Sequence, residues 1–148
     1  MRFTYPALVE RVSEDEVVVS FRDLPECRTA GIDEAEALAE AQDALSEAIA
    51  GRMDDDEYIP EPSTLRGDEF NIAVPTDIAA KAALVIACRQ SRLSLEALAG
   101  ILEIDRPAIS QMLDPRQVSH TDDITRALRI LGSELVLEVR ALDPVSSE

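Results

Sequence analysis

The chain has 148 residues, which is enough for one ordinary domain or two small ones. Its 14 Lys and Arg against 30 Asp and Glu give a formal charge of −16, which excludes a protein that coats nucleic acid or anionic lipid along its whole length. Apolar residues make up 46% of the chain, too many for disorder throughout. Because it has neither an apolar run of ~20 residues nor a hydrophobic signal core, we expect a cytoplasmic protein without a membrane span.

Charge and aromatic residues divide the chain into two halves. Residues 1–74 hold six Arg against 19 acids, a net charge of −13, together with all five aromatic residues. Residues 75–148 hold eight cations against 11 acids, a net charge of −3. We therefore predict an acidic unit at 1–63 whose last strand lies at 69–74, a linker region at 64–68, and a second unit at 75–148.

The first half is predicted to form a small α+β unit. Apolar residues alternate with polar ones at 3–9 and 70–74, and this period of two predicts strands there. Residues 17–21 are rich in β-branched side chains and predict a second strand, and the short stretch 27–31 is expected to pair as a third. Asp33 followed by Glu36 indicates the start of a helix, whose apolar stripe runs from Leu38 to Ile49 before a stop at Gly51. The predicted order is β-β-β-α-β. One helix covers one face of the sheet, so the other face is left for water or a partner.

The acids of the first half have two interpretations. They form either a docking surface for a basic protein or a solvated face that keeps the chain soluble, and the excess of 13 negative charges favours the basic partner. A metal or catalytic site is not indicated, because His120 is the chain's one His and Cys27 lies 61 positions from Cys88. We therefore expect no enzyme activity, no metal and no cofactor.

The second half is predicted to form helices at 76–90, 95–102, 106–113 and 121–131, and its middle pair carries the strongest functional pattern. A DNA-binding helix-turn-helix needs a small residue where its helices cross, here Ala99, and apolar residues ten and thirteen positions later, here Ile109 and Met112. The turn usually holds Gly because its φ is positive, but this chain has Glu103 there. The pattern favours a helix-turn-helix over a plain helical bundle.

The outward face of the second helix of this pair would meet DNA. Arg reads guanine edges, Gln reads adenine edges, and Ser reaches a base or a phosphate. The candidate DNA-binding residues are Ser94, Arg106, Ala108, Ser110, Gln111 and Arg116, the last at a phosphate. Residues 89–129 hold six Arg and six acids, so one copy should bind DNA weakly.

Alternation of apolar and polar residues over 135–141 predicts a terminal strand. A lone strand after a helical bundle is unstable, so a second copy of the chain would have to supply its partner. Leu135, Leu137 and Val139 are therefore the candidate dimerisation residues. We expect a homodimer or a higher even-numbered oligomer through the second unit.

Several of these segments together resemble the HicB-type antitoxins of bacterial toxin–antitoxin pairs. The matching stretches are Phe21 to Cys27, Thr29-Ala30-Gly31, Glu34-Ala35 with the acidic helix after it, and Tyr58-Ile59-Pro60-Glu61-Pro62-Ser63. The Ile-Pro-x-Pro-Ser pattern in the last stretch is fairly specific. With the helix-turn-helix and the terminal strand, the sequence is similar to the long form of the family over about residues 3 to 142.

The resemblance implies a partial ribonuclease-H-like first domain without catalytic residues, followed by an all-α helix-turn-helix domain of the Xre/Cro type. It implies a toxin partner, HicA, which is small and basic and cuts mRNA, and operator DNA of the chain's own operon. The candidate toxin-binding residues are Asp23, Leu24, Pro25 and Glu26. Two alternatives stay open: a transcription regulator whose acidic domain senses a small ligand, and a nuclease with a ribonuclease-H-like fold.

Overall fold

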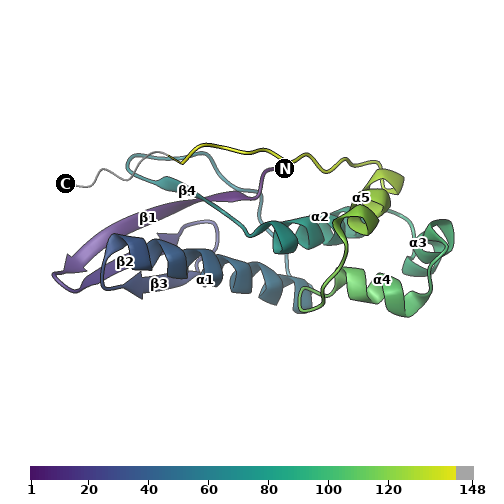
Figure 1. Cartoon of the computed structure of the whole chain (residues 1–148), viewed down its shortest axis with the longest axis horizontal. Helices are drawn as coiled ribbons and strands as arrows, with labels where there is room; N and C mark the ends of the chain where they lie inside the picture. The colour runs from purple at the N-terminus through teal and green to yellow at the C-terminus, as the bar shows by residue number, and fades with distance from the viewer. Residues whose placement is uncertain (143–148) are drawn as a thin grey trace.

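The computed structural model describes residues 1–142, so the last six residues of the unit predicted at 75–148 lie outside the described part (Figure 1). Within it, strands precede and flank the first helix, and four further helices follow. The elements are β1 (Thr4–Ser13), β2 (Glu16–Phe21), β3 (Arg28–Gly31), α1 (Glu34–Asp54), β4 (Phe70–Ala73), α2 (Thr76–Gln90), α3 (Leu95–Leu102), α4 (Arg106–Leu113) and α5 (Thr121–Ile130). This mixture is consistent with an α+β fold. None of the described helices is long and apolar enough to cross a membrane.

The four strands form one antiparallel sheet in the order β3-β2-β1-β4. Alternate side chains of β1 and β2, among them Tyr5, Val19 and Phe21, are buried on the face that α1 covers (Figure 1). Gly31 in β3 permits this close packing, because an added Cβ would lie 2.5 Å from the backbone nitrogen of Ala37. The sheet thus has one face buried against α1, as the single predicted helix required.

α1 begins where the sequence predicts and ends later than expected. Asp33 Oδ1 accepts a hydrogen bond from the Glu36 N–H at 2.8 Å, which is the predicted cap. The predicted stop at Gly51 is wrong, since the helix continues to Asp54. Met53 is only 8% exposed in the core, and burying its side chain gains about 1.5–3 kcal/mol, more than the ~1 kcal/mol that Gly costs inside a helix. The extension carries an acidic run, residues 54–57, to the vicinity of α4.

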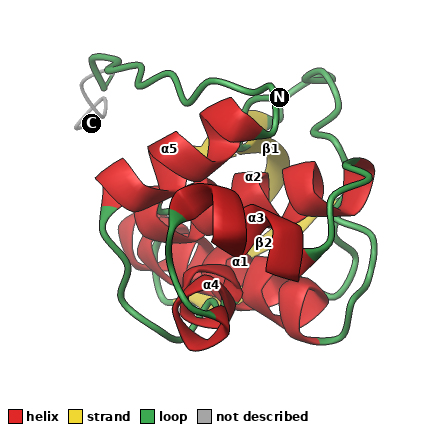
Figure 2. Ribbon diagram, turned by 90° about the vertical axis from the view of Figure 1, so that its right-hand side faces the viewer, coloured by secondary structure: helices red, strands yellow, loops and turns green. Residues whose placement is uncertain are grey.

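α2 packs into two hydrophobic clusters at once. Ile78 and Val85 belong to the cluster between the sheet and α1, whereas Ala80 and Leu84 belong to the cluster that α3, α4 and α5 enclose. These helices lie at one end of the molecule in Figure 1, and Figure 2, which looks onto that end, shows them grouped around α2. The two halves therefore share a helix. The boundaries of the predicted domains stay a prediction.

α3 and α4 have the predicted bounds, because their caps are local. Ser94 Oγ accepts a hydrogen bond from the Ala97 N–H at 3.0 Å, and Asp105 Oδ1 accepts one from the Ala108 N–H at 2.9 Å. Glu103, between the helices, has φ 57° and ψ 40°. The turn therefore takes the left-handed conformation without Gly, at a cost on the order of 1 kcal/mol.

The strand predicted at 135–141 is not formed in this single chain. Residues 133–142 run as an extended segment back from α5 past the N-terminus (Figure 1). There Arg2 Nη2 lies 4.0 Å from Glu138 Oε2. Leu135 is half-buried against the second cluster, but Leu137 and Val139 are 79% and 88% exposed. Alternation predicts which side chains would share a face, but it does not supply the neighbouring strand that a ladder needs.

Lys81 of α2 fixes the end of α4. It is the chain's one lysine and is only 3% exposed. Its Nζ donates hydrogen bonds to the carbonyl oxygens of Gln111, Met112 and Asp114 at 2.9, 3.3 and 2.8 Å, and to Ser119 Oγ at 2.9 Å. Burial lowers the pKa of Lys81 from its ordinary value. Helices leave their last carbonyls without partners, and a cation there complements the helix dipole, so this ammonium acts as a cap from outside the helix.

Replacing Lys81 by Met removes the ammonium and leaves the carbonyls at the end of α4 without their donor. We expect the free energy of unfolding to fall by about 2–3 kcal/mol, measured by urea denaturation at neutral pH. Arg92→Met is the matched control, because Arg92 is exposed, and its effect should stay within about 0.5 kcal/mol. A Lys81→Met protein as stable as this control would contradict the capping role.

Candidate functional site

The outward face of α4 collects the exposed residues of the predicted DNA-binding set. Ile109 and Met112 are buried in the second cluster, as the pattern predicted, and Ser110 and Gln111 are exposed on the other side of the helix. Ala108 is half-buried and lines, with Gln111, a groove of about 220 Å³ between α4 and α5. Ser110 thus lies at the surface of α4, and Ala108 lies at the edge of a groove. Gln111 is exposed, but its Nε2 donates a hydrogen bond to the Val118 carbonyl at 3.3 Å, which a base would have to replace.

Arg106 and Ser94 both have partners inside the chain. Arg106, the first residue of α4, forms an ion pair with Glu96 in the first turn of α3. The two side chains are 65% and 59% exposed, so water weakens the pair and a phosphate or a base can replace Glu96. Ser94 caps α3 with its hydroxyl and is exposed. Glu96 was missed by the sequence reasoning, since a lone acid ten residues before an Arg carries no signal.

Arg116 does not lie on the outward face of α4. Its Nη2 and Nε donate hydrogen bonds to Asp54 Oδ2 at 2.8 and 3.2 Å, which ties the loop after α4 to the end of α1. The hydrogen bond to Asp54 raises the pKa of Arg116 above its ordinary value. The structure thus brings together two residues that are 62 positions apart, and the role expected for Arg116 at a phosphate needs this ion pair to open.

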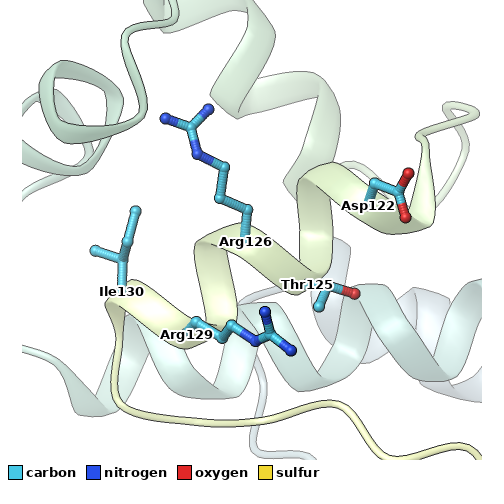
Figure 3. Close-up of a pocket in the computed structure, with 5 residues that line it drawn as sticks. All are labelled: Asp122, Thr125, Arg126, Arg129 and Ile130. Carbon is cyan, nitrogen blue, oxygen red and sulfur yellow. The ribbon is translucent and has the colours of Figure 1, made fainter.

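α5 contributes cations that no sequence pattern singled out. A shallow groove of about 470 Å³ is lined by Asp122, Thr125, Arg126, Arg129 and Ile130 (Figure 3). The figure shows Arg126 and Arg129 extending in different directions from the helix, so they do not converge on one ligand. Arg126 also lines the groove beside Gln111. It therefore adds a positive charge next to the outward face of α4.

The predicted toxin-binding loop, which joins β2 to β3, is fastened to the segment after α1. Asp23 accepts hydrogen bonds from the N–H and Oγ of Ser63 at 2.8 and 2.6 Å, and Leu24 is fully buried in the first cluster. Glu26 accepts two hydrogen bonds from Arg52 at 2.5 and 3.0 Å, which hold the pKa of Glu26 below its ordinary value. Pro25 is exposed. Three of the four predicted residues therefore hold the fold together.

The Ile-Pro-x-Pro-Ser segment, residues 59–63, contains the Ser63 that Asp23 binds, and it makes further contacts with the sheet. Tyr5 Oη donates a hydrogen bond to the Pro60 carbonyl at 2.7 Å, and Ile59 is buried in the first cluster. Arg22 Nε and Nη2 donate hydrogen bonds to Glu69 Oε1 and Oε2 at 2.7 and 3.1 Å, and Nη2 also donates one to the Thr64 carbonyl. The motif thus holds the long connection between α1 and β4 against the sheet.

The solvent side of α1 carries exposed carboxylates along its length, at Glu34, Glu36, Glu40, Asp43 and Glu47. Glu36 has a structural role, since its Oε2 accepts a hydrogen bond from the Ile32 N–H at 2.7 Å. Among residues 1–142, no group of three or more His, Cys, Asp or Glu side chains could hold a metal ion. Burial raises the pKa of the Cys27 thiol to about 11, which keeps it in the unreactive protonated form. The chemistry available on α1 is electrostatic attraction of a positively charged surface.

Comparison with known proteins covers both halves of the chain. Residues 4–83 match the family described as HicB_like antitoxin of bacterial toxin-antitoxin system. The chain is 34% identical over 133 residues to Antitoxin HicB of Escherichia coli (strain K12), covering 90% of this chain and 96% of that protein. It is 38% identical over 133 residues to Antitoxin HicB 2 of Photorhabdus laumondii subsp. laumondii, covering 90% and 94% of the two chains. These matches confirm the resemblance, and the chain belongs to the HicB-like family of antitoxins of bacterial toxin–antitoxin systems.

Proposed function

We propose that this chain neutralises a small, basic, mRNA-cleaving toxin of the HicA type in the cytoplasm and represses its own operon. Membership of the antitoxin family, together with the net charge of −13 on residues 1–74, carries the proposal. In this proposal the β1-β2-β3-α1-β4 unit is a partial ribonuclease-H-like domain that binds the toxin and has no catalytic role. The α3–α4 pair is the helix-turn-helix that binds the operator.

The toxin would meet the acidic surface of α1. Asp23 and Leu24 have partners inside the chain, so of the predicted loop Pro25 and the exposed carboxylate of Glu26 are left for contact, the latter in competition with Arg52. The carboxylates of α1 are exposed and lie on the side of the helix away from the sheet. Charges of one sign on one partner speed the encounter with a partner of the opposite sign and make association sensitive to salt.

Replacing Glu40, Asp43 and Glu47 together by Gln, Asn and Gln should slow association with the toxin about ten-fold at low salt. The change removes charge and leaves the side-chain volume almost intact. Stopped-flow mixing with the small basic protein encoded beside the gene measures the rate. The control carries the same loss of charge in and beside the β1–β2 turn, through Glu10→Gln, Glu14→Gln and Asp15→Asn, which are also exposed positions. Equal rates for the two triple variants would contradict binding through α1.

The helix-turn-helix proposal is supported by the way in which α3 and α4 are held. Ala99 and Ile109 are buried between them, and Glu103 takes the positive φ that the turn requires. The opposite face of α4 then points to solvent, with Ser110 and Gln111 exposed. In this proposal Arg106, Ser110 and Gln111 read bases, Ser94 and Ala108 lie against the DNA backbone or the groove wall, and Arg116 reaches a phosphate.

Gln111→Ala should cost ~1–3 kcal/mol of operator binding and relax the preference at one base position, because the side-chain amide reads an adenine edge. Fluorescence anisotropy with the DNA upstream of the gene, and with each single base change in it, measures both effects. Gln42→Ala is the control, since Gln42 is an exposed residue of α1. Affinity loss without any relaxed position would place Gln111 at the DNA backbone instead of a base.

The exposed segment after α5 is proposed to pair with its copy in a second chain. Leu137 and Val139 are large apolar side chains at 79% and 88% exposure, and Leu135 anchors the start of the segment on the second cluster. Pairing would complete a ladder that one chain cannot form. It would also place two copies of α4 in half-sites ~34 Å apart, which offsets the weak binding of one near-neutral unit.

Leu137→Asp should separate the dimer, because it places a charge in the shared apolar face. Sedimentation velocity measures the mass, and operator affinity should fall with it. Leu65→Asp is the control, since Leu65 is also a partly exposed leucine, in the connection between α1 and β4. A Leu137→Asp protein that remains dimeric and binds the operator as tightly as the wild type would place the interface elsewhere.

A further inference from the structure

The acidic end of α1 is in contact with the unit that carries α4. The run Asp54-Asp55-Asp56-Glu57 ends the helix and begins the connection to β4. Asp54 holds Arg116 through two hydrogen bonds at 2.8 and 3.2 Å, and Asp56 Oδ1 lies 3.0 Å from Arg89 Nη2. Arg89 also donates a hydrogen bond to the Glu57 carbonyl at 2.7 Å. Two arginines of the second unit are thus engaged by carboxylates of the first.

Arg116 lies in the loop just after α4, beside the helix that the proposed function places on DNA. Arg116 follows the end of α4 by three residues. Its backbone N–H donates a hydrogen bond to Asp114 Oδ1 at 2.9 Å, and the Asp114 carbonyl accepts one from Lys81 Nζ. The backbone beside Arg116 is therefore held in place. Figure 1 shows the loop after α4 meeting the end of α1. The Arg116 side chain is 62% exposed, so a phosphate can reach its guanidinium once the ion pair with Asp54 breaks.

Asp54 and a DNA phosphate compete for the same donors. A guanidinium bound to a carboxylate neutralises less phosphate charge, and binding of DNA gains affinity from each phosphate that is neutralised. Asp55 and Glu57, which make no ion pair in the described part of the chain, add negative charge at the same edge and repel the duplex. Both effects act against DNA binding. Because exposed ion pairs are weak, the competition lowers affinity without abolishing it.

We propose that the acidic end of α1 is an intramolecular competitor of DNA, which limits operator affinity by holding Arg116 through Asp54. The inference rests on the proposed operator binding and adds a regulatory contact between the two units. The contact between Asp54 and Arg116 therefore lowers the affinity for DNA, whereas a contact that positioned Arg116 for a phosphate would raise it.

The test compares full-length wild type, Asp54→Asn, Arg116→Ala and the double variant by fluorescence anisotropy, with operator duplex and with a scrambled duplex. Asp54→Asn should bind the operator about two- to five-fold more tightly, the range that opening an exposed ion pair allows. The slope of log affinity against log salt should become steeper by about 0.9, since one more phosphate is neutralised. In the Arg116→Ala background, Asp54→Asn should leave the slope unchanged. Asp15→Asn, an exposed acid in the β1–β2 turn, controls for the loss of one negative charge.

Each outcome separates this inference from the function on which it rests. A wild type that binds operator and scrambled DNA equally would overturn operator recognition and this inference with it. If the wild type prefers the operator and Asp54→Asn behaves like Asp15→Asn, only the inference fails. Weaker binding of Asp54→Asn, with unchanged thermal unfolding, would show that Asp54 positions Arg116 for DNA, the opposite of the proposal. A gain that persists in the Arg116→Ala background would assign the effect to general charge and likewise reject competition for Arg116.

Discussion

The position of α4 depends on one buried ammonium. An eight-residue helix is too short to be stable by itself in water. Lys81 reaches from α2 to the last carbonyls of α4, and Asp105 caps the opposite end, so both ends are fixed by side chains. A helix held in this way loses little freedom when it enters a groove. The orientation of the proposed DNA-reading face is therefore set by α2, which does not contribute to that face.

The first unit is organised around two arginines that fasten a long connection. Arg22 and Arg52 bind Glu69 and Glu26, and Asp23 holds Ser63. The residues that carried the family resemblance thus keep the connection between α1 and β4 against the sheet. The segments that carry the family resemblance therefore stabilise the fold, whereas the carboxylates of α1, to which we assign the toxin under the proposed function, have no such structural role within the described residues apart from Glu36.

Local patterns predicted local structure well, and contacts between distant residues were not predictable. Ser94 and Asp105 gave the starts of α3 and α4, since a cap and the helix it begins are neighbours in the sequence. Lys81 bonds groups 30 to 38 residues away, and no spacing rule links them. The end of α1 was predicted too early because the free energy gained by burying Met53 exceeds the cost of Gly51 inside the helix. The terminal strand is not formed in the single chain, and its pairing with a second copy stays a prediction, because alternation cannot reveal whether a neighbouring strand exists. The family resemblance supplied the class of partner, a toxin, which no residue pattern could name.

The sharing of α2 determines where this chain can be cut and rejoined with a relative. A chimaera joined at residue 75 would bring a foreign helix whose inner face must replace Ile78, Ala82 and Val85 beneath the sheet. A junction in the loop after α2 keeps those contacts, but the new partner must then fit Ala80, Leu84 and Ala87 and offer carbonyls to Lys81. Either junction cuts through a packed surface. The two halves of such chains should therefore be exchanged as matched pairs, with α2 as the part that must fit both.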